Sequence, residues 1–190
     1  MHVNEAIQFR RTIRKFQQKP LLSEQLKRYV EAARLAPSGA NLQPLKYYLV
    51  SSSRMAEKVF PLLAWAGYLN HGYDPREGER PVGYIVVCAD TAIRKNGYEM
   101  DVGAAVENMI LSALEDGVGA CWLGSVKREM LRELLNIPEE LAICCVVALG
   151  YPAEAPEKVE AAEGNIEYYL ENGTLKVPKR PAEDVIVECV

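Results

Sequence analysis

Residues 101–117 constrain the fold most, because their apolar side chains recur at helical spacing over a long stretch. They form one wide apolar face, and alanine and glycine keep the helix slim; the face comprises Val102, Ala105, Val106, Met109, Ile110, Ala113 and Leu114. Such a helix is expected to be buried, either in the core of one domain or against its counterpart in a dimer. Asp101 is expected to be its N-cap, and Glu107 with Asn108 to be paired structural residues without a chemical role.

Shorter segments with strand or helix character alternate around this helix. Strands are predicted at residues 46–50, 83–89, 119–124 and 142–149. Helices are predicted at residues 4–9 with Asn4 as N-cap, from Ser23 to before Pro37, at residues 54–64, and from Ser125 or Lys127 to before Pro138. This alternation predicts an α/β or α+β sheet with helices on its faces.

Composition indicates an ordinary globular protein. The 190 residues suffice for one domain with a real core. Lysine and arginine number 22 against 26 aspartate and glutamate, a net charge of −4, which argues against a nucleic-acid-binding face. No apolar run is long enough to cross a bilayer and no signal peptide is recognisable, so we expect no membrane partner and a cytoplasmic location.

Cysteine and histidine usage indicates neither a metal site nor a hydrolase. The five cysteines show no CxxC spacing and are expected to be free thiols. The chain has two histidines, His2 and His71, which argues against a histidine-rich metal site or a Ser/His/Asp triad. We therefore predict no metal and no side-chain nucleophile.

Residues 10–16, here called the basic stretch, place three arginines and one lysine close together in an acidic chain. Arginine suits phosphate because its planar fork donates paired hydrogen bonds and stays charged when partly desolvated. With Ile13 and Phe16 turned inward, the guanidinium groups would converge on one small, doubly charged group, to which Thr12 adds a hydroxyl donor. The alternative is a solvated basic face.

Residues 37–44, here called the Asn41 loop, combine helix breakers with carboxamides. The side chains of Asn41 and Gln43 offer donors and acceptors side by side, which suits the edge of a uracil-like ring. The alternative is a plain connector between a helix and a strand.

Residues 65–81 mix glycine and proline with Trp65, Tyr68 and Tyr73. Exposed aromatic residues among turn residues predict a lid or a substrate-facing loop. The alternative is a surface loop whose aromatic residues pack back on the domain. From residue 151 onward the chain is expected to form an irregular, extended arm, in which Lys179 and Arg180 make a basic spot that, taken alone, would be a solvated tail.

Several separated motifs, in this order, resemble the nitroreductase-like FMN-dependent oxidoreductases. They are the basic stretch, residues 36–44, the helix and strand of residues 101–124, residues 149–152 and residues 177–181. The match covers nearly the whole chain, and the ordered set is more specific than any one motif. The resemblance implies an intertwined homodimer of α+β subunits around a mixed sheet. Residues 1–150 would be the FMN-binding core, and residues 151–190 an arm of the same domain that reaches the partner.

The resemblance also implies a cofactor site at the dimer interface. Arg10, Arg11 and Thr12 would serve the FMN phosphate, and Arg14 would reach N1 and O2 of the flavin ring. The Asn41 loop would lie along the ring and the ribityl chain through Pro37, Ser38, Gly39, Asn41 and Gln43. Backbone groups of Leu123 and Gly124 would meet N5 and O4. Basic residues near the C-terminus, Lys179 and Arg180, would complete the phosphate site.

The activity that the resemblance implies is that of an FMN-dependent NAD(P)H oxidoreductase. NADH or NADPH would give a hydride to flavin N5, and a nitroaromatic, a quinone or a similar small acceptor would then take the electrons in a ping-pong cycle. Arg14 beside N1 and O2 would favour the reduced flavin, so no catalytic side chain is needed. The alternatives are a non-catalytic FMN-binding protein for storage or sensing, a basic module for nucleotides or nucleic acid, and dehalogenation or flavin fragmentation on the same scaffold.

Overall fold

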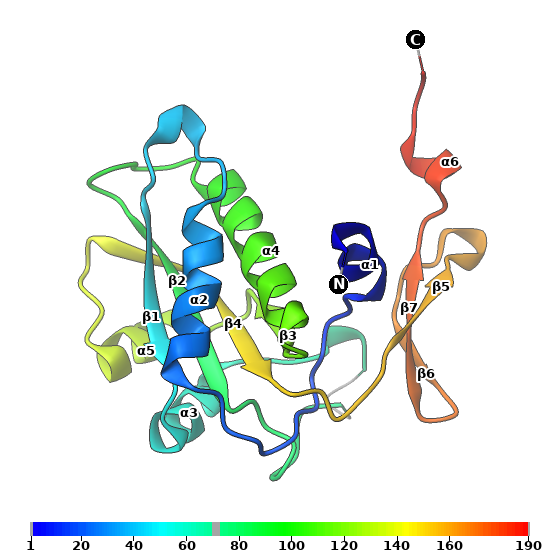
Figure 1. Ribbon diagram of the computed structural model, residues 1–190, viewed down its shortest axis with the longest axis horizontal. Coiled ribbons are helices and arrows are strands. Elements are labelled where there is room, and N and C mark those ends of the chain that lie inside the picture. Colours follow the sequence, from blue (N-terminus) through cyan, green and yellow to red (C-terminus); the bar gives the residue numbers. More distant parts are fainter. Residues whose placement is uncertain (1, 70–72, 190) are drawn as a thin grey trace.

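A computed structural model describes residues 2–69 and 73–189, which build a four-stranded antiparallel sheet at the centre of the protein (Figure 1). The strand order is β1-β2-β4-β3, with β1 (Leu45–Val50), β2 (Gly83–Asp90), β3 (Gly119–Leu123) and β4 (Leu141–Gly150). The inner strands β2 and β4 are almost wholly buried, which explains why each is a nearly continuous apolar run. A bridge between Thr12 and Ala120 adds a parallel element at the edge of β3.

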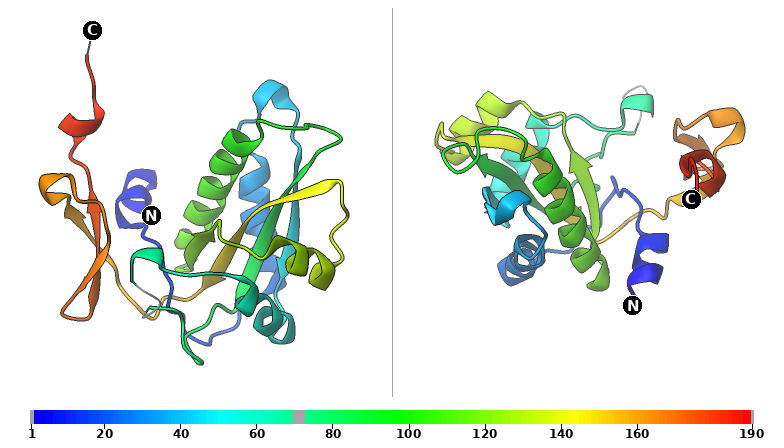
Figure 2. Two further views of the ribbon diagram at one scale, coloured as in Figure 1. Left: turned by 180° about the vertical axis from the view of Figure 1, so that it is seen from behind. Right: turned by 90° about the horizontal axis from the view of Figure 1, so that it is seen from above.

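Helices cover both faces of this sheet, which confirms the predicted α+β class (Figures 1 and 2). The covering helices are α2 (Ser23–Arg34), α3 (Ser53–Val59), α4 (Glu99–Glu115) and α5 (Arg128–Leu135). Two further helices, α1 (Val3–Phe9) and α6 (Ala182–Val185), lie away from the sheet. On one face α2 and α4 pack side by side over Ile85 and Val87 of β2. On the other face α3 and α5 pack over Tyr84 and Val86. No helix of the described residues is long and apolar enough to cross a membrane.

Two predicted helix boundaries in the N-terminal half of the chain are wrong. α1 begins at Val3, so Asn4 lies inside the helix and is not its N-cap. The helix that was expected to reach Ala64 gives way after Val59 to a 3-10 turn, η2 (Phe60–Leu62). Pro61 accounts for this change, because proline has no N–H with which to continue the α-helical hydrogen bonds.

The central helix α4 also differs from its prediction at both ends. It begins two positions earlier than expected, so Asp101 lies in its first turn and is not the N-cap. It ends before Gly117, which turns the chain into the left-handed region at φ +71°. Glu107 and Asn108 are paired as expected: Glu107 forms an ion pair with the basic stretch, and Asn108 donates a hydrogen bond of 3.3 Å to a backbone carbonyl of α2.

The basic stretch is anchored to the end of the sheet by Ile13 and Phe16, which are both buried, as predicted. Gly119 and Gly150 lie opposite each other in the β3–β4 ladder. A Cβ on Gly119 would lie 2.6 Å from Cγ1 of Ile13, and a Cβ on Gly150 would lie 2.8 Å from Cδ1 of Phe16. The two glycines thus leave the space that the apolar side chains fill. The backbone N–H of Ile13 also donates to the carbonyl of Ala120 at 2.9 Å.

The aromatic residues of the segment 65–81 do not all face solvent. Trp65 and Tyr73 have exposed fractions of 6% and 5%, so the prediction of exposed aromatic residues is wrong for these two. Both belong to the core on the α3 side of the sheet, because burying a large aromatic side chain outweighs the turn-forming tendency of its neighbours. Tyr68 is 51% exposed and lies at the surface. Residues 70–72 of this segment lie outside the described part of the chain.

The arm that follows β4 contains a small sheet, so the prediction of an irregular chain is wrong (Figures 1 and 2). Its strand order is β5-β7-β6, with β5 (Glu157–Glu160), β6 (Tyr169–Glu171) and β7 (Thr174–Lys179). Asn172 and Gly173 have φ angles of 50° and 80°, which suit the tight hairpin between β6 and β7. Leu175 of β7 is buried in the main core, so the arm is packed against the domain that carries it.

Replacing Gly150 by alanine is expected to lower the free energy of unfolding by about 1–3 kcal/mol, because the new methyl group overlaps Phe16. The matched control is Gly67→Ala: a Cβ on Gly67 would meet no atom within 4 Å, so its effect should stay within about 0.5 kcal/mol. Urea unfolding of the two variants measures the difference. Equal midpoints would show that the packing of Phe16 tolerates a side chain at position 150.

Candidate functional site

Three arginines of the basic stretch are half-buried, and each has a guanidinium nitrogen that lacks a hydrogen bond to any described residue. The Nε atoms of Arg10, Arg11 and Arg14 are buried and make no hydrogen bond within the described part of the chain. Arg10 Nε does lie 3.1 Å from Glu107 Oε1, in an ion pair without hydrogen-bond geometry. Buried polar atoms in folded proteins are nearly always paired. The basic stretch therefore suits an anionic ligand better than a solvated surface.

The electrostatics of the basic stretch also favour an anionic ligand. Burial and the neighbouring charge of Arg10 lower the pKa of Arg11, so the two cations destabilise each other. A cavity of about 260 Å³ lies against them, between the C-terminal end of α4 and the chain that follows β4. Its lining is mostly apolar, and its charged residues are Arg10, Arg11 and Glu154. An anion bound at this place would offset the repulsion between the guanidinium groups.

Arg14 is held from two directions by residues that follow β4. Its backbone N–H and that of Lys15 both donate to Oε1 of Glu154, the second at 3.1 Å. Tyr73 donates its hydroxyl to the other oxygen of Glu154, and burial together with this bond raises the pKa of Tyr73. The guanidinium carbon of Arg14 lies 4.7 Å from the ring centroid of Tyr168. No local sequence pattern singles out Glu154 or Tyr168, because their partner is far away in the chain.

The edge strand β3 brings further predicted residues to the basic stretch. Thr12 forms its bridge with Ala120 in the middle part of β3, and Leu123 ends the same strand. Gly124 is exposed, and a Cβ there would meet no atom within 4 Å, so its backbone is accessible. Thr12, Arg14 and the backbone of Leu123 and Gly124 are therefore gathered along one edge of the sheet.

The Asn41 loop is held in shape by Asp101 of α4. The carboxylate accepts a hydrogen bond of 2.6 Å from Ser38 Oγ and one of 3.2 Å from the backbone N–H of Gly39. Ser38 Oγ in turn accepts the backbone N–H of Gln43 at 2.9 Å. Asn41 and Gln43 have φ angles of 56° and 50°, a strained conformation that this network supports. Their exposed side chains pair with each other at 3.1 Å.

The surroundings of Asp101 stabilise the charged form of its carboxylate. Asp101 is 5% exposed, and Arg94 Nη1 lies 3.3 Å from its carboxylate. Burial alone would raise the pKa of Asp101, but the hydrogen bonds from Ser38 and Gly39 and the charge of Arg94 outweigh burial and lower it. Gly39 lets this guanidinium group approach closely: a Cβ there would lie 2.6 Å from Arg94 Nη1 and would displace the end of the Arg94 side chain. The role of Asp101 escaped prediction because a first-turn acid and an N-cap acid look alike in sequence.

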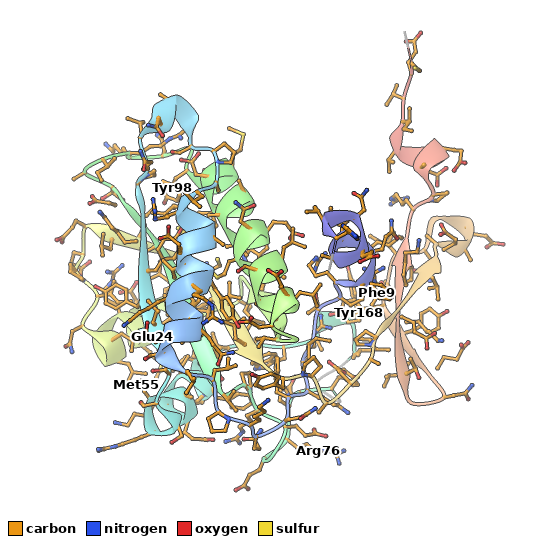
Figure 3. All side chains as sticks on the ribbon, in the orientation of Figure 1. Phe9, Glu24, Met55, Arg76, Tyr98 and Tyr168 are labelled. Atoms are coloured by element: carbon orange, nitrogen blue, oxygen red, sulfur yellow. The ribbon has the colours of Figure 1, made fainter. Side chains whose placement is uncertain are left out.

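The basic stretch and the Asn41 loop lie at opposite ends of α4. The loop is bound to Asp101 in the first turn of the helix, whereas the basic stretch packs on Gly119, just beyond the last turn. The 17 residues of α4 span roughly 25 Å. Figure 3 labels Tyr98 beside the first of these ends and Tyr168 near the other. One chain therefore does not bring the two halves of the predicted site together.

Lys179 and Arg180 are exposed at the end of β7, the middle strand of the arm sheet. Their place relative to the basic stretch is thus set by the arm and not by the main sheet. Their assignment to a phosphate site stays a prediction.

Solved structures share this fold. A crystal structure of a candidate nitroreductase from Desulfovibrio desulfuricans, in complex with FMN, has a TM-score of 0.74 at 24% identity and covers 100% of this chain and 98% of that one. The NADPH:FMN oxidoreductase of Vibrio harveyi, solved with NAD+, has a TM-score of 0.68 at 25% identity and covers 97% of this chain and 76% of that one. The fold defines the chain as a nitroreductase-like protein.

Sequence relatives narrow this class to one family. One relative is a protein of Archaeoglobus fulgidus that is named as a candidate NADH dehydrogenase/NAD(P)H nitroreductase. It is 36% identical over 159 residues, which are 80% of this chain and 86% of that protein. The model of the Nitroreductase family matches residues 7–70 and 83–151, which include the basic stretch, the Asn41 loop and α4. The chain belongs to the nitroreductase family, and it is an oxidoreductase.

Replacing Asp101 by asparagine is expected to lower the free energy of unfolding by about 1–3 kcal/mol at neutral pH, because a charged hydrogen-bond acceptor is lost. Since the pKa of Asp101 is lowered in the fold, its stabilising contribution is present above the ordinary value of 3.8 and is lost as the pH falls through the lower, folded value. In urea unfolding the difference between the parent and the variant should therefore shrink below pH 3.8. Asp184→Asn, at an exposed carboxylate of α6, is the control. A difference that stays constant into strong acid would contradict the assignment.

Proposed function

We propose that the protein is an FMN-dependent oxidoreductase that takes electrons from NADH or NADPH and delivers them to a small acceptor such as a nitroaromatic or a quinone. The observation that carries the proposal is the set of buried Nε atoms at Arg10, Arg11 and Arg14, which make no hydrogen bond within the described part of the chain. Such a set suits a ligand with a phosphate dianion and a second group that becomes anionic. FMN has both, in its phosphate and in the N1–O2 edge of its ring.

Each part of the basic stretch has its own role in this proposal. Arg10, Arg11 and Thr12 would hold the phosphate, with the cavity after α4 beside the two arginines. Arg14 would face N1 and O2 of the ring, where its charge favours the reduced state. The backbone of Leu123 and the accessible backbone of Gly124 would meet N5 and O4. Lys179 and Arg180 would add positive charge at the phosphate.

A homodimer would complete the site. The basic stretch and the Asn41 loop are both assigned to the same ring, yet α4 separates them by roughly 25 Å within one chain. A second copy packed along α4 would bring the Asn41 loop of one subunit to the basic stretch of the other. Exposed apolar side chains on α1 support such a contact, because Val3 and Phe9 are 70% and 71% exposed. The exposed end of the arm after β7, residues 182–189, would then extend across the partner.

In this mechanism the residues of the chain bind and orient the cofactor. Bound FMN would supply the redox chemistry, because it can take hydride from the nicotinamide and pass electrons to the acceptor in alternating steps. Asp101 keeps the Asn41 loop in the shape that presents Asn41 and Gln43. Glu154 keeps the backbone of the basic stretch in place through two N–H groups. No side chain of the described residues is needed as a nucleophile.

Mixing the purified flavoprotein with NADH or NADPH under anaerobic conditions tests the activity. The flavin absorbance is expected to bleach and to return when a nitroaromatic or a quinone is added, because the two half-reactions are independent. A flavin that never bleaches would favour the non-catalytic alternative of FMN storage or sensing. A protein that releases no FMN on denaturation would refute both.

Mixing two defective variants tests whether the site lies between subunits. Arg14→Ala removes a charged contact and should weaken FMN binding about ten- to a hundredfold. The double variant Asn41→Ala, Gln43→Ala should weaken it from the loop side. In a heterodimer of these two variants one of the two sites keeps both halves intact. Random remixing of equal amounts makes about half of the dimers heterodimers, so about a quarter of the parent FMN-binding capacity should return. The measurement is FMN titration of separated and remixed subunits.

The control for this experiment is Arg54→Ala, which removes an exposed arginine on α3 that belongs to neither half of the site. It should leave FMN binding unchanged, alone and in mixtures. A heterodimer that recovers no binding would show that the basic stretch and the Asn41 loop act within one subunit.

A further inference from the structure

We propose that Tyr168 is a positioning residue for Arg14. Docking of the arm thereby sets the preference of the site for reduced over oxidised FMN, that is, the ratio of the two affinities. This inference rests on the proposed function, since it concerns the cofactor that Arg14 would contact. It goes beyond that function by making the arm, through one aromatic ring, a determinant of the flavin reduction potential.

The first step is the direction of the Arg14 side chain. Its Nε is buried and makes no hydrogen bond within residues 2–69 and 73–189. Its guanidinium carbon lies 4.7 Å from the centroid of the Tyr168 ring, within the distance at which a cation is attracted to an aromatic face. The ring is therefore the contact that orients the guanidinium group.

The second step is the backbone beneath that side chain. The N–H groups of Arg14 and Lys15 both donate to Glu154, and the neighbouring Ile13 is buried. With the backbone fixed, the freedom left to Arg14 is rotation about its side-chain bonds. A ligand that stops this rotation has to offset the lost entropy. Tyr168 restricts the rotation before any ligand binds.

The third step is what holds Tyr168 itself. The backbone N–H of Tyr68 donates to the Tyr168 hydroxyl at 3.4 Å, and the two rings lie 4.9 Å apart between centroids. Tyr168 directly precedes β6, and it packs against the main core together with Leu175 of β7. Tyr168, labelled in Figure 3, thus joins the arm to the basic stretch. The ring takes its place only when the arm is docked.

The final step is the difference between the two states of the cofactor. Reduced FMN tends to lose its N1 proton and then carries negative charge at that edge, whereas the oxidised ring is neutral there. A guanidinium group displaced from N1 and O2 loses more interaction with the charged form than with the neutral one. Loss of the Tyr168 ring should therefore lower the ratio of the two affinities. A purely structural role would lower both affinities equally.

The experiment compares Tyr168→Leu with the parent holoprotein. Titration of the apoprotein with oxidised FMN gives one dissociation constant, and the midpoint potential of the bound flavin, measured against dyes of known potential, gives the ratio of the reduced and oxidised constants. Tyr168→Leu is expected to lower the preference for reduced FMN about three- to tenfold, the factor that corresponds to one lost cation–π contact. Tyr168→Phe loses the long 3.4 Å bond from the Tyr68 N–H but keeps the aromatic face, so it should stay within about twofold of the parent.

Tyr169→Leu is the matched control, because it changes the adjacent tyrosine, which is exposed on β6. A double-mutant cycle keeps the test valid where Tyr168→Leu loosens the arm. In an Arg14→Ala background the change at position 168 should leave the ratio of affinities unaltered, since no guanidinium group remains to be oriented. An effect of equal size in both backgrounds would overturn the inference, as would an unchanged ratio in Tyr168→Leu alone.

Failure of the proposed function gives a different result. The parent protein itself would then contain no FMN, or its flavin would not respond to NADH or NADPH. Failure of the inference alone would leave an active parent and a Tyr168→Leu variant with the same midpoint potential.

Discussion

The packing of Ile13 and Phe16 against a pair of glycines is the contact on which the candidate site depends. Gly119 and Gly150 face each other across β3 and β4, and neither has room for a Cβ. Because the two apolar side chains enter this space, the arginines between and beside them are held at the edge of the core, half-buried and incompletely paired. Desolvating cations costs free energy, and a bound anion would offset that cost. One apolar contact thus explains both where the arginines lie and why a ligand would bind them.

The rigidity of the two halves decides how they can meet. Asp101 holds the Asn41 loop at the first turn of α4, and Glu154 holds the basic stretch beyond the last turn. Neither half is free to travel the roughly 25 Å length of the helix. Assembly of two copies is therefore a better route to a complete site than loop movement within one chain. Within each chain, Tyr168 of the arm contacts Arg14, the arginine that would face the flavin ring.

Local patterns in the sequence predicted well what depends on local physics. The inner strands were predictable because burial on both faces requires continuous apolar runs, as in β2 and β4. Trp65 and Tyr73 were predicted to be exposed from their glycine and proline neighbours, yet the gain from burying an aromatic ring decided their position. Asp101 was predicted to be an N-cap, but its partners Ser38 and Gly39 lie more than sixty positions earlier in the chain. Periodicity cannot reveal such a contact.

The sequence by itself determined the α+β class, the membership of the nitroreductase family and the set of residues proposed to bind FMN, because these follow from periodic patterns and from motifs in a fixed order. Only the tertiary structure decided that the basic stretch and the Asn41 loop stand at opposite ends of α4, and that Glu154 and Tyr168 hold Arg14. The physical reason is distance along the chain. Contacts between residues more than a hundred positions apart depend on how the sheet and the arm pack, and no short segment encodes them.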